Sequence, residues 1–200
     1  MAEQSQPARR GPYAKTTPRK AEIVAAATAT FAAHGYQSGS LRQIAKQLEL
    51  SLGAVMHHFP TKVSLLAAVL EQEDASDPDV AKRSRADGFI PTILEMVARN
   101  KRRQELVRMF SIVSSEATNS DHEAHAWLVR RYTRVTAMYA DLIDYDRELG
   151  RLAHGRDSEV LAAVVIGGWE GIQVRWLADG SDPVEMMRVF LVDLLHPLSP

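Results

Sequence analysis

The sequence predicts an all-α protein built from two helical domains, and three observations support this prediction. Apolar residues recur every three to four positions in one segment after another, which is typical of amphipathic helices. No segment shows the sustained alternation of apolar and polar residues that half-buried strands require. The 200 residues are 46% hydrophobic and 24% charged, an ordinary globular composition in a chain long enough to bury a substantial core.

The composition also excludes several kinds of site. Cysteine is absent, so disulfides, zinc–cysteine centres and thiol nucleophiles are excluded. No apolar run approaches the roughly 18–20 residues that a membrane-spanning helix needs. Residues 1–20 contain no apolar stretch of the kind found in secretion signals. These features predict a cytoplasmic protein with no membrane partner.

Charge is distributed unevenly along the chain, although the net charge is only −1. Residues 1–62 carry eight basic and three acidic side chains, a balance of +5, whereas the other 138 residues carry sixteen basic and twenty-two acidic ones, a balance of −6. A basic segment on an acidic body suggests a polyanion such as nucleic acid as the partner of that segment. A chance cluster of charge in a solvated tail is the alternative.

The N-terminal region is predicted to contain an arm and a helix. Residues 1–16 are polar and lack periodicity, which predicts a flexible basic arm. A helix is expected to begin at Arg19, to bury Ile23 and Phe31 on one face, and to stop at Gly35.

Two short helices follow, each preceded by a serine that can cap it. Ser40 and Gln43 form a capping-box pattern, and Ser51 can cap the next helix, which Pro60 ends. Two such helices, joined by a tight turn and braced by a preceding helix, form a helix-turn-helix, here at about residues 40–59. The second helix of this motif fits the major groove of DNA, and helix N-termini favour phosphates.

A series of residues with a characteristic joint spacing runs through the segment from Arg19 to Glu71. Its members are Phe31, Gly35, Tyr36, Ser40, Ile44, Ala45, Gly53, His58, Phe59, Lys62, Leu65 and Leu66. With this spacing, the segment resembles the N-terminal DNA-binding domain of TetR-type transcriptional regulators. The resemblance implies a homodimeric repressor that binds double-stranded DNA at a palindromic operator and is released by a small-molecule effector.

The resemblance also implies roles for individual residues. Gly53, Ala54 and His57 match family positions near bases, and Met56 and His58 match positions near phosphates. Adjacent helical residues diverge by about 100°, so the two histidines are not expected to share a metal ion. The predicted DNA-binding residues are Arg19, Ser40, Arg42, Ser51, Gly53, Ala54, Met56, His57, His58 and Lys62.

Three residues depart from the family pattern. Met56 stands where a tyrosine usually donates a hydrogen bond to a phosphate, which methionine cannot do. Gly39 replaces a common threonine or serine, and Glu49 replaces a usual small residue. Either the basic residues of the arm supply the missing affinity, or DNA binding is weakened and the chain is a helical ligand-binding or adaptor protein.

The break at residues 75–79 is the best domain junction, which predicts a DNA-binding domain at 17–74 and a ligand-binding and dimerisation domain at 75–200. Residues 158–180 and 182–198 form a helical hairpin, and two such hairpins would make a four-helix bundle. The resemblance supports dimerisation through these last two helices, although an intramolecular core is the alternative. The predicted interface residues are Val164, Gly167, Gly168, Gly171, Val174, Met187, Phe190 and Leu194.

The helices of residues 88–150 are expected to enclose a ligand cavity with several aromatic side chains and few charges, suited to an apolar or amphipathic molecule. The candidate lining residues are Phe110, Ser114, Trp127, Tyr132, Tyr139, Trp169 and Gln173. A small helical enzyme is a further alternative, but the sequence has no nucleophile motif, glycine-rich phosphate loop or metal-ligand spacing. We therefore expect no enzymatic activity, no catalytic residue, no metal and no cofactor.

Overall fold

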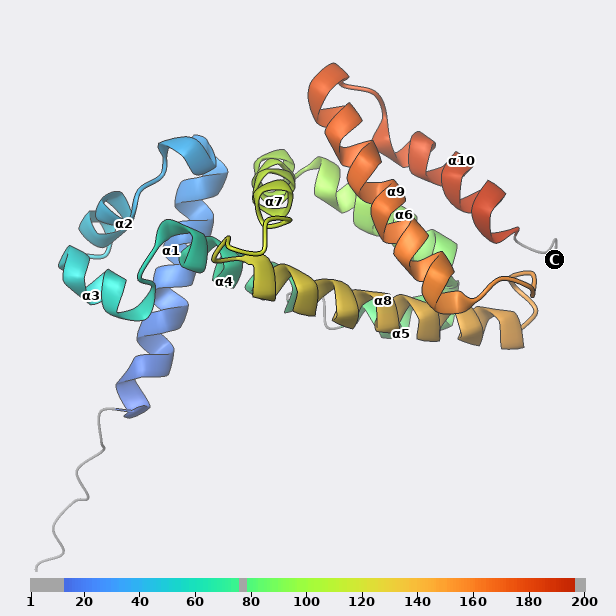
Figure 1. Ribbon diagram of the computed structural model, residues 1–200, viewed down its shortest axis with the longest axis horizontal. Coiled ribbons are helices and arrows are strands. Elements are labelled where there is room, and N and C mark those ends of the chain that lie inside the picture. Colours follow the sequence, from blue (N-terminus) through green and yellow to red (C-terminus); the bar gives the residue numbers. More distant parts are fainter. Residues whose placement is uncertain (1–12, 76–78, 197–200) are drawn as a thin grey trace, which may run out of the picture. The chain divides into compact units, whose positions relative to one another are not determined.

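The computed structural model describes residues 13–75 and 79–196, and the regular elements in this part of the chain are all helices (Figure 1). The predicted all-α fold is therefore confirmed. The chain packs as two compact units, Met1–Val69 and Leu70–Pro200. The division between them lies inside helix α4 (Lys62–Ala75), before the junction that the sequence suggests.

The first unit contains α1 (Tyr13–Ser38), α2 (Leu41–Gln47), α3 (Leu52–His58) and the beginning of α4. Each helix contributes to one core. The side chains of this core that have no exposed surface include Ile23, Ala27, Phe31, Ile44, Val55, Leu65 and Leu66. The hydroxyl of Thr30 donates a hydrogen bond to Gln47 Oε1 at 3.0 Å and so links α1 to α2.

Helix α1 differs from its prediction at the N-terminal end. It begins at Tyr13, so residues 13–16 are helical rather than part of an arm, whereas residues 1–12 lie outside the described residues. At the predicted stop, Gly35 has φ 74° and ψ 162°, a conformation that breaks the helix before helical backbone continues to Ser38. The prediction of a break at Gly35 is confirmed, because glycine adopts positive φ without steric cost.

Gly39 is required by packing. A Cβ atom added at Gly39 would lie 2.7 Å from Cδ1 and 2.8 Å from Cε1 of Phe31. The Phe31 ring is completely buried, so it has little room to move away. This contact gives a steric reason why a glycine stands where related domains often carry a hydroxyl side chain.

We expect Gly39→Ala to lower the free energy of unfolding by about 1–3 kcal/mol, because over-packing a filled core forces neighbouring groups apart. Chemical denaturation would measure this loss. Gly53→Ala is the matched control, since its Cβ would meet only Ser51 Oγ at 3.9 Å, and alanine favours a helix by up to about 1 kcal/mol. Equal stabilities of the two variants would contradict the steric explanation.

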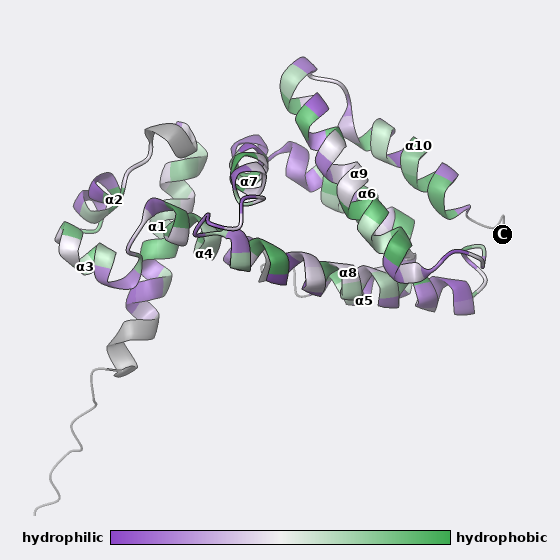
Figure 2. Ribbon diagram, in the orientation of Figure 1, coloured by the Kyte–Doolittle hydropathy of each residue, from purple (hydrophilic) through white to green (hydrophobic). Residues whose placement is uncertain are grey.

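The second unit contains the end of α4 and six further helices. These are α5 (Val80–Asp87), α6 (Phe89–Lys101), α7 (Gln104–Glu116), α8 (His125–Glu148), α9 (Ser158–Asp179) and α10 (Pro183–Leu195). Helix α9 packs against α7, α8 and α10, and α10 also packs against α6. The core that these contacts form includes Phe89, Ile93, Ile143, Ala162, Met187 and Leu191. Figure 2 shows hydrophobic residues along both α9 and α10.

The two segments of the predicted hairpin, 158–180 and 182–198, correspond to α9 and α10, and the predicted helical region 88–150 contains α6, α7 and α8. Helix α8 begins at His125, after the turns and bends of residues 117–124. Helix α5 was not predicted. Its sequence, VAKRSRAD, is strongly charged and buries only Ser84, so it has no apolar stripe to reveal it.

Helix α9 is more apolar than the sequence pattern suggested. Among the described residues it is the one helix whose length and composition could match a membrane span. Its buried side chains, including Leu161, Val165 and Trp169, pack in the core of the second unit. The apolar character of α9 therefore has a structural explanation in core packing.

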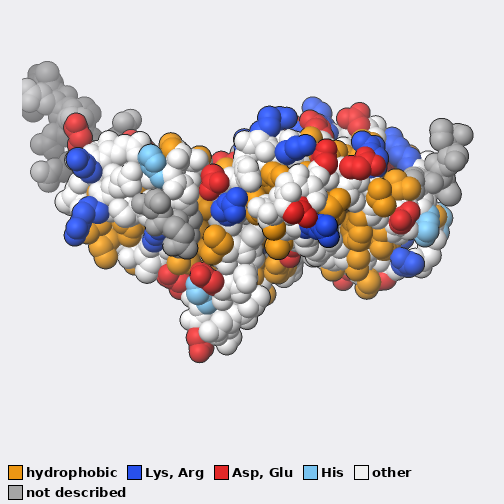
Figure 3. Space-filling view, turned by 90° about the horizontal axis from the view of Figure 1, so that it is seen from above, with side chains coloured by type: hydrophobic (Ala, Val, Ile, Leu, Met, Phe, Trp, Pro, Cys, Tyr) orange, Lys and Arg blue, Asp and Glu red, His pale blue; other side chains and the backbone are white. Residues whose placement is uncertain are grey.

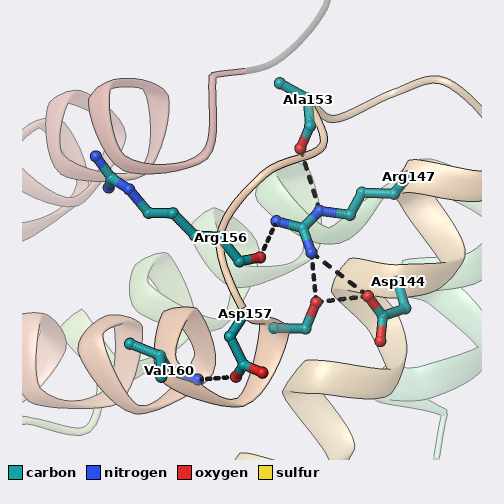
Figure 4. A network of polar contacts seen from close by, with 7 residues as sticks. Asp144, Arg147, Ala153, Arg156, Asp157 and Val160 are labelled. Atoms are coloured by element: carbon teal, nitrogen blue, oxygen red, sulfur yellow. Dashed lines mark hydrogen bonds and ion pairs between the residues drawn. The ribbon is translucent and has the colours of Figure 1, made fainter.

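The guanidinium group of Arg147 anchors the loop between α8 and α9 (Figure 4). Its Nε donates to the carbonyl of Ala153 at 3.1 Å, and its Nη2 donates to the carbonyl of Arg156 at 2.8 Å. Its Nη1 donates to Ser158 Oγ at 2.5 Å, and that hydroxyl donates to Asp144. One side chain thus holds two loop carbonyls and the first residue of α9 against α8.

Candidate nucleic-acid interface and internal cavity

The two short helices of the first unit are capped as the sequence predicts. Ser40 Oγ accepts a hydrogen bond from the Gln43 amide at 3.2 Å, and Ser51 Oγ accepts one from the Ala54 amide at 3.1 Å. Between the helices, Glu49 has φ 55°, a left-handed conformation that is costly for most side chains. This sharp turn separates α2 from α3.

Helix α3 has one buried and one exposed face. Val55 has no exposed surface and Phe59, just after the helix, is 3% exposed. Gly53 and His57 are exposed, and the exposed fraction of Met56 is 43%. A large apolar side chain with that much exposure is available for contact with a partner. The helix therefore presents its N-terminal half and its methionine outward while its apolar residues fix it to the core.

The two histidines of α3 occupy different environments. His57 is exposed and His58 is half-buried. Their ring centroids lie 5.3 Å apart with the ring planes at 71°, so the rings meet edge to face. Among the described residues, no group of three histidine, aspartate or glutamate side chains is placed to hold a metal ion.

Helix α4 starts with a reciprocal cap next to Lys62. The Ser64 amide donates to Thr61 Oγ1 at 3.0 Å, and the Thr61 amide donates to Ser64 Oγ at 3.1 Å. This capping box fixes the first turn of the helix, where the amide groups and the helix dipole favour an anion. Partial burial lowers the pKa of Lys62.

Other basic side chains lie on the surface of the same unit. Arg42 and Lys46 are exposed on α2. On α1, Arg19 forms an exposed ion pair with Glu22 at 2.7 Å, which offsets part of its charge. Sequence reasoning did not select Lys20, whose Nζ lies 5.5 Å from the centre of the Phe59 ring. The available signal was a lysine next to Arg19 at the start of the first helix.

This arrangement has relatives among known proteins. Residues 23–69 match the family described as bacterial regulatory proteins, tetR family. Residues 23–69 therefore form a DNA-binding segment of the TetR type. With this segment, the chain is a DNA-binding transcriptional regulator and not an enzyme.

The similarity extends beyond the DNA-binding segment. An HTH-type transcriptional repressor of Mycobacterium tuberculosis is 25% identical over 171 residues, which cover 86% of this regulator and 88% of that protein. A TetR-family regulator from Pectobacterium atrosepticum is 24% identical, with a TM-score of 0.70, over 95% of this chain and all of that one. Thermus thermophilus FadR, a repressor solved with lauroyl-CoA, is 23% identical, with a TM-score of 0.67, over 88% and 93% of the two chains. The two solved structures share the fold of this chain.

An internal cavity of about 360 Å³ lies within the second unit. Four of the predicted residues line it: Phe110, Tyr139, Trp169 and Gln173. Gln173 is 3% exposed, and its Oε1 accepts a hydrogen bond from Ser111 at 3.3 Å. The predicted helices therefore enclose a cavity, and α9 contributes to its wall.

Three predicted pocket residues do not line the cavity. The buried hydroxyl of Ser114 donates to the carbonyl of Phe110 in its own helix. Trp127 packs edge to face against the Phe110 ring with their centroids 6.5 Å apart. Tyr132 donates its hydroxyl hydrogen to Glu170 at 2.8 Å, so it supports a lining residue from behind. For these residues the prediction was wrong because aromatic or polar character does not specify which face a residue occupies.

The cavity wall carries more charge than the sequence suggested. Its lining includes Arg99, Arg103, Arg131, Arg134, Glu73 and Glu170. The two α8 arginines lie three residues apart and share a stripe with the lining residues Val135 and Met138. The sequence could have indicated this lining only through the shared spacing of these residues. Charged residues beside an apolar stripe are more often solvated than part of a cavity wall.

Glu170 should make stability depend on pH. Burial raises its pKa, and this outweighs the lowering effects of the Tyr132 hydrogen bond and of Arg131. A raised folded-state pKa contributes stability that is fully present at low pH and is lost as pH rises through that value. We expect Glu170→Gln, which keeps an acceptor for Tyr132, to raise Tm at pH 8 more than at pH 4. Thermal denaturation at both pH values checks this, and an equal change at both would contradict it.

The outer face of α9 carries an exposed stripe of small and apolar residues. Val164 and Val174 have exposed fractions of 42% and 59%, and Gly167 and Gly171 between them are also exposed. Val160 continues the stripe toward the start of the helix, with an exposed fraction of 58%. Figure 3 shows hydrophobic side chains gathered over the α9–α10 hairpin. The alternating spacing of three and four residues keeps this stripe on one side of the helix.

Four other predicted interface residues pack within the chain itself. A Cβ atom at Gly168 would lie 2.4 Å from the Phe190 ring, so this glycine lets α9 and α10 approach closely. Phe190 and Leu194 are half-buried against the core. Met187 is completely buried and lines the cavity. The prediction that Met187 lies in an outer interface is therefore wrong, because its side chain faces the interior of the second unit.

Proposed function

We propose that this regulator is a cytoplasmic homodimeric repressor that binds a palindromic operator and is released from it by a small-molecule effector. The observation that carries the DNA-binding part is the geometry of α3. Val55 and Phe59 hold one face in the core, while Gly53, Met56 and His57 are exposed. The relative from Mycobacterium tuberculosis is a transcriptional repressor, which supports repression rather than activation.

The positions around α3 suit a DNA backbone. The capped N-termini of α2, α3 and α4 present amide groups, and Arg42 and Lys62 lie in the first turn of α2 and of α4 respectively. Amide groups and cations of this kind bind phosphates and set the register of a protein on DNA. Exposed residues of α3 would then contact base edges in the major groove.

The exposed stripe of α9 supports a two-fold dimer. A single soluble chain gains nothing by exposing three valines with two glycines on one helical face, whereas a second copy of the same stripe would bury them. The half-sites of a palindromic operator, one helical turn or a multiple of it apart, would then match the symmetry of the protein.

Helix α4 supports coupling between an effector and DNA. It begins with Lys62 in the first unit, and in the second unit its residues Leu70 and Glu73 line the cavity. A ligand that shifts this end of the helix would change the affinity for DNA, and DNA would change the affinity for the ligand by the same factor.

Selection of bound duplexes from a random library with purified protein tests the proposal. We expect a palindromic consensus and binding that weakens steeply between 50 and 200 mM salt, because phosphate contacts release counterions. Failure to enrich any duplex, or binding that does not respond to salt, would favour the helical adaptor over the repressor.

Met56→Tyr should tighten operator binding by about three- to tenfold. A tyrosine hydroxyl adds a donor for a phosphate oxygen, and one such hydrogen bond contributes about 0.5–1.5 kcal/mol. The side chain at this position is 43% exposed, so the change should leave the core intact. Fluorescence anisotropy with the selected duplex measures the gain. Met56→Leu is the control, and an equal affinity for the two variants would mean that no phosphate lies within reach.

A further inference from the structure

We propose that the cavity of the second unit binds an uncharged amphipathic molecule, an apolar chain or ring that carries one hydroxyl group. The proposal rests on the proposed function of this cavity as the effector site and specifies the chemistry of its ligand. Two features carry it: a buried amide with one unused end, and charges in the half-buried part of the wall that balance.

Gln173 places a deeply buried polar group in the cavity wall. Its side chain lines the cavity from α9 and is 3% exposed. One end of the amide lies 3.3 Å from Ser111 Oγ, and no other hydrogen bond joins this amide to a described residue. The amide nitrogen is not one of the fully enclosed polar atoms without a partner in the described part of the chain, so it keeps accessible surface. Since a buried polar group without a partner is costly, a ligand in the cavity would supply what the protein leaves out.

The neighbouring serine can satisfy the amide only in part. Ser111 has one hydroxyl hydrogen, and its Oγ also donates to the carbonyl of Val107 at the shorter distance of 3.0 Å. A rotation of the Gln173 amide by 180° would let Nε2 donate to Ser111 Oγ and would direct Oε1 to the cavity. Gln173 can therefore offer a ligand either an amino donor or a carbonyl acceptor. A hydroxyl group both donates and accepts, so it pairs with the amide in either orientation.

The charges of the wall favour an uncharged ligand. Arg103 and Arg134 line the cavity but are exposed, so water solvates their charges. The half-buried charged side chains of the wall are Arg99, Arg131, Glu73 and Glu170. These are two cations and two anions, which leave no net charge for an ion to compensate. An ionic ligand would therefore lose part of its hydration without gaining a counter-charge.

The remaining wall is apolar and buried. Ile93, Val165, Trp169 and Met187 line the cavity, and each of these side chains is less than 10% exposed. Trp169 precedes Gln173 by about one helical turn, so the amide and the indole share one face of α9. A volume of about 360 Å³ lies at the lower end of the range for small-molecule sites. The apolar part of the ligand would lie against this surface with its hydroxyl group at Gln173.

Isothermal titration calorimetry on the full-length protein without DNA tests this proposal with four eight-carbon probes below their solubility limits. These are octan-1-ol, octanoate, octylamine and 1-fluorooctane, which share a chain and differ in the end group. We expect octan-1-ol to bind at least about tenfold more tightly than either ion, because the ions must be desolvated without a compensating charge. The fluorinated probe has the same shape but no hydroxyl group, and it serves as the reference for the variants.

Two variants separate recognition of the hydroxyl group from general binding of apolar chains. Gln173→Met keeps the length of the side chain and removes the amide. It should weaken octan-1-ol by about three- to tenfold, the contribution of one neutral hydrogen bond, and should strengthen 1-fluorooctane, which no longer leaves a buried amide unpaired. Asn100→Leu is the matched control, since Asn100 is an amide of the same wall that is only half-buried. It should keep the wild-type ratio of the two affinities.

Circular dichroism would establish that both variants are folded, and the gain for 1-fluorooctane is a change that unfolding cannot mimic. Octan-1-ol that does not bind, or that binds no more tightly than either ion, would overturn the proposal. So would a wild-type affinity ratio in Gln173→Met, or an equal fall of that ratio in Asn100→Leu. Failure of the proposed function has a different signature. In that case octan-1-ol would bind with the expected end-group and variant pattern but would not release the selected operator duplex in an anisotropy assay.

Discussion

Val164→Glu should prevent the dimerisation that we propose and remove most of the proposed operator binding. Val164 lies within the exposed α9 stripe, with an exposed fraction of 42%. Two-fold symmetry would bring the same stripe from each copy together, so one substitution would place two carboxylates in an apolar interface. Burying a carboxylate without a partner costs several kcal/mol. Because that loss occurs twice per dimer, we expect dissociation at micromolar concentrations.

Sedimentation equilibrium would measure the change in mass, and fluorescence anisotropy would measure the loss of operator affinity. Val129→Glu is the matched control, since Val129 is 48% exposed on α8 and lies outside the stripe. The control should remain dimeric and bind the operator. A dimeric Val164→Glu protein would place the interface elsewhere, whereas a monomer that keeps full affinity would remove the need for a two-fold complex.

The capping residues of the first unit show why so much of it could be predicted from the sequence. A cap is a local interaction between residues three positions apart. Ser40, Ser51 and Thr61 therefore mark where their helices begin, whatever the rest of the fold. In the structure, the side chain of each of these three residues accepts a capping hydrogen bond from a backbone amide. The burial of Val55 and Phe59 has the same local origin, because their spacing puts them on one face of α3.

The cavity shows where local reasoning stops. Which face of α8 encloses a cavity depends on helices that are distant in sequence, so the sequence alone placed Tyr132 in the lining and left out Arg131. The same limit applies to the α9–α10 hairpin. Gly168 was predicted to lie in the dimer interface, but the helix that approaches it closely is α10 of the same chain. Periodicity reports that a face is apolar and does not say which neighbour covers it.

Arg147→Met should lower the free energy of unfolding by about 2–4 kcal/mol. The side chain of Arg147 is only 10% exposed, whereas that of its ion-pair partner Asp144 is 60% exposed. The main loss is therefore in hydrogen bonds rather than in the ion pair. The carbonyls of Ala153 and Arg156 and the hydroxyl of Ser158 would each lose a charged donor, and an unsatisfied buried group costs about 1–3 kcal/mol.

Arg147→Lys should recover only part of this loss, because an ammonium group cannot match acceptors arranged around a planar guanidinium. Arg188→Met is the control: Arg188 pairs with Glu185 at 3.6 Å with both side chains more than half exposed, and such pairs contribute at most about 1 kcal/mol. Urea denaturation of the three variants gives the comparison. Equal losses in the Arg147→Met and Arg188→Met proteins would mean that the α8–α9 loop does not depend on this side chain. A large loss of stability in Arg147→Met but not in Arg188→Met would show that the loop fixes the start of α9. The loop would then also set the positions of the α9 residues that form the cavity wall and the outer stripe.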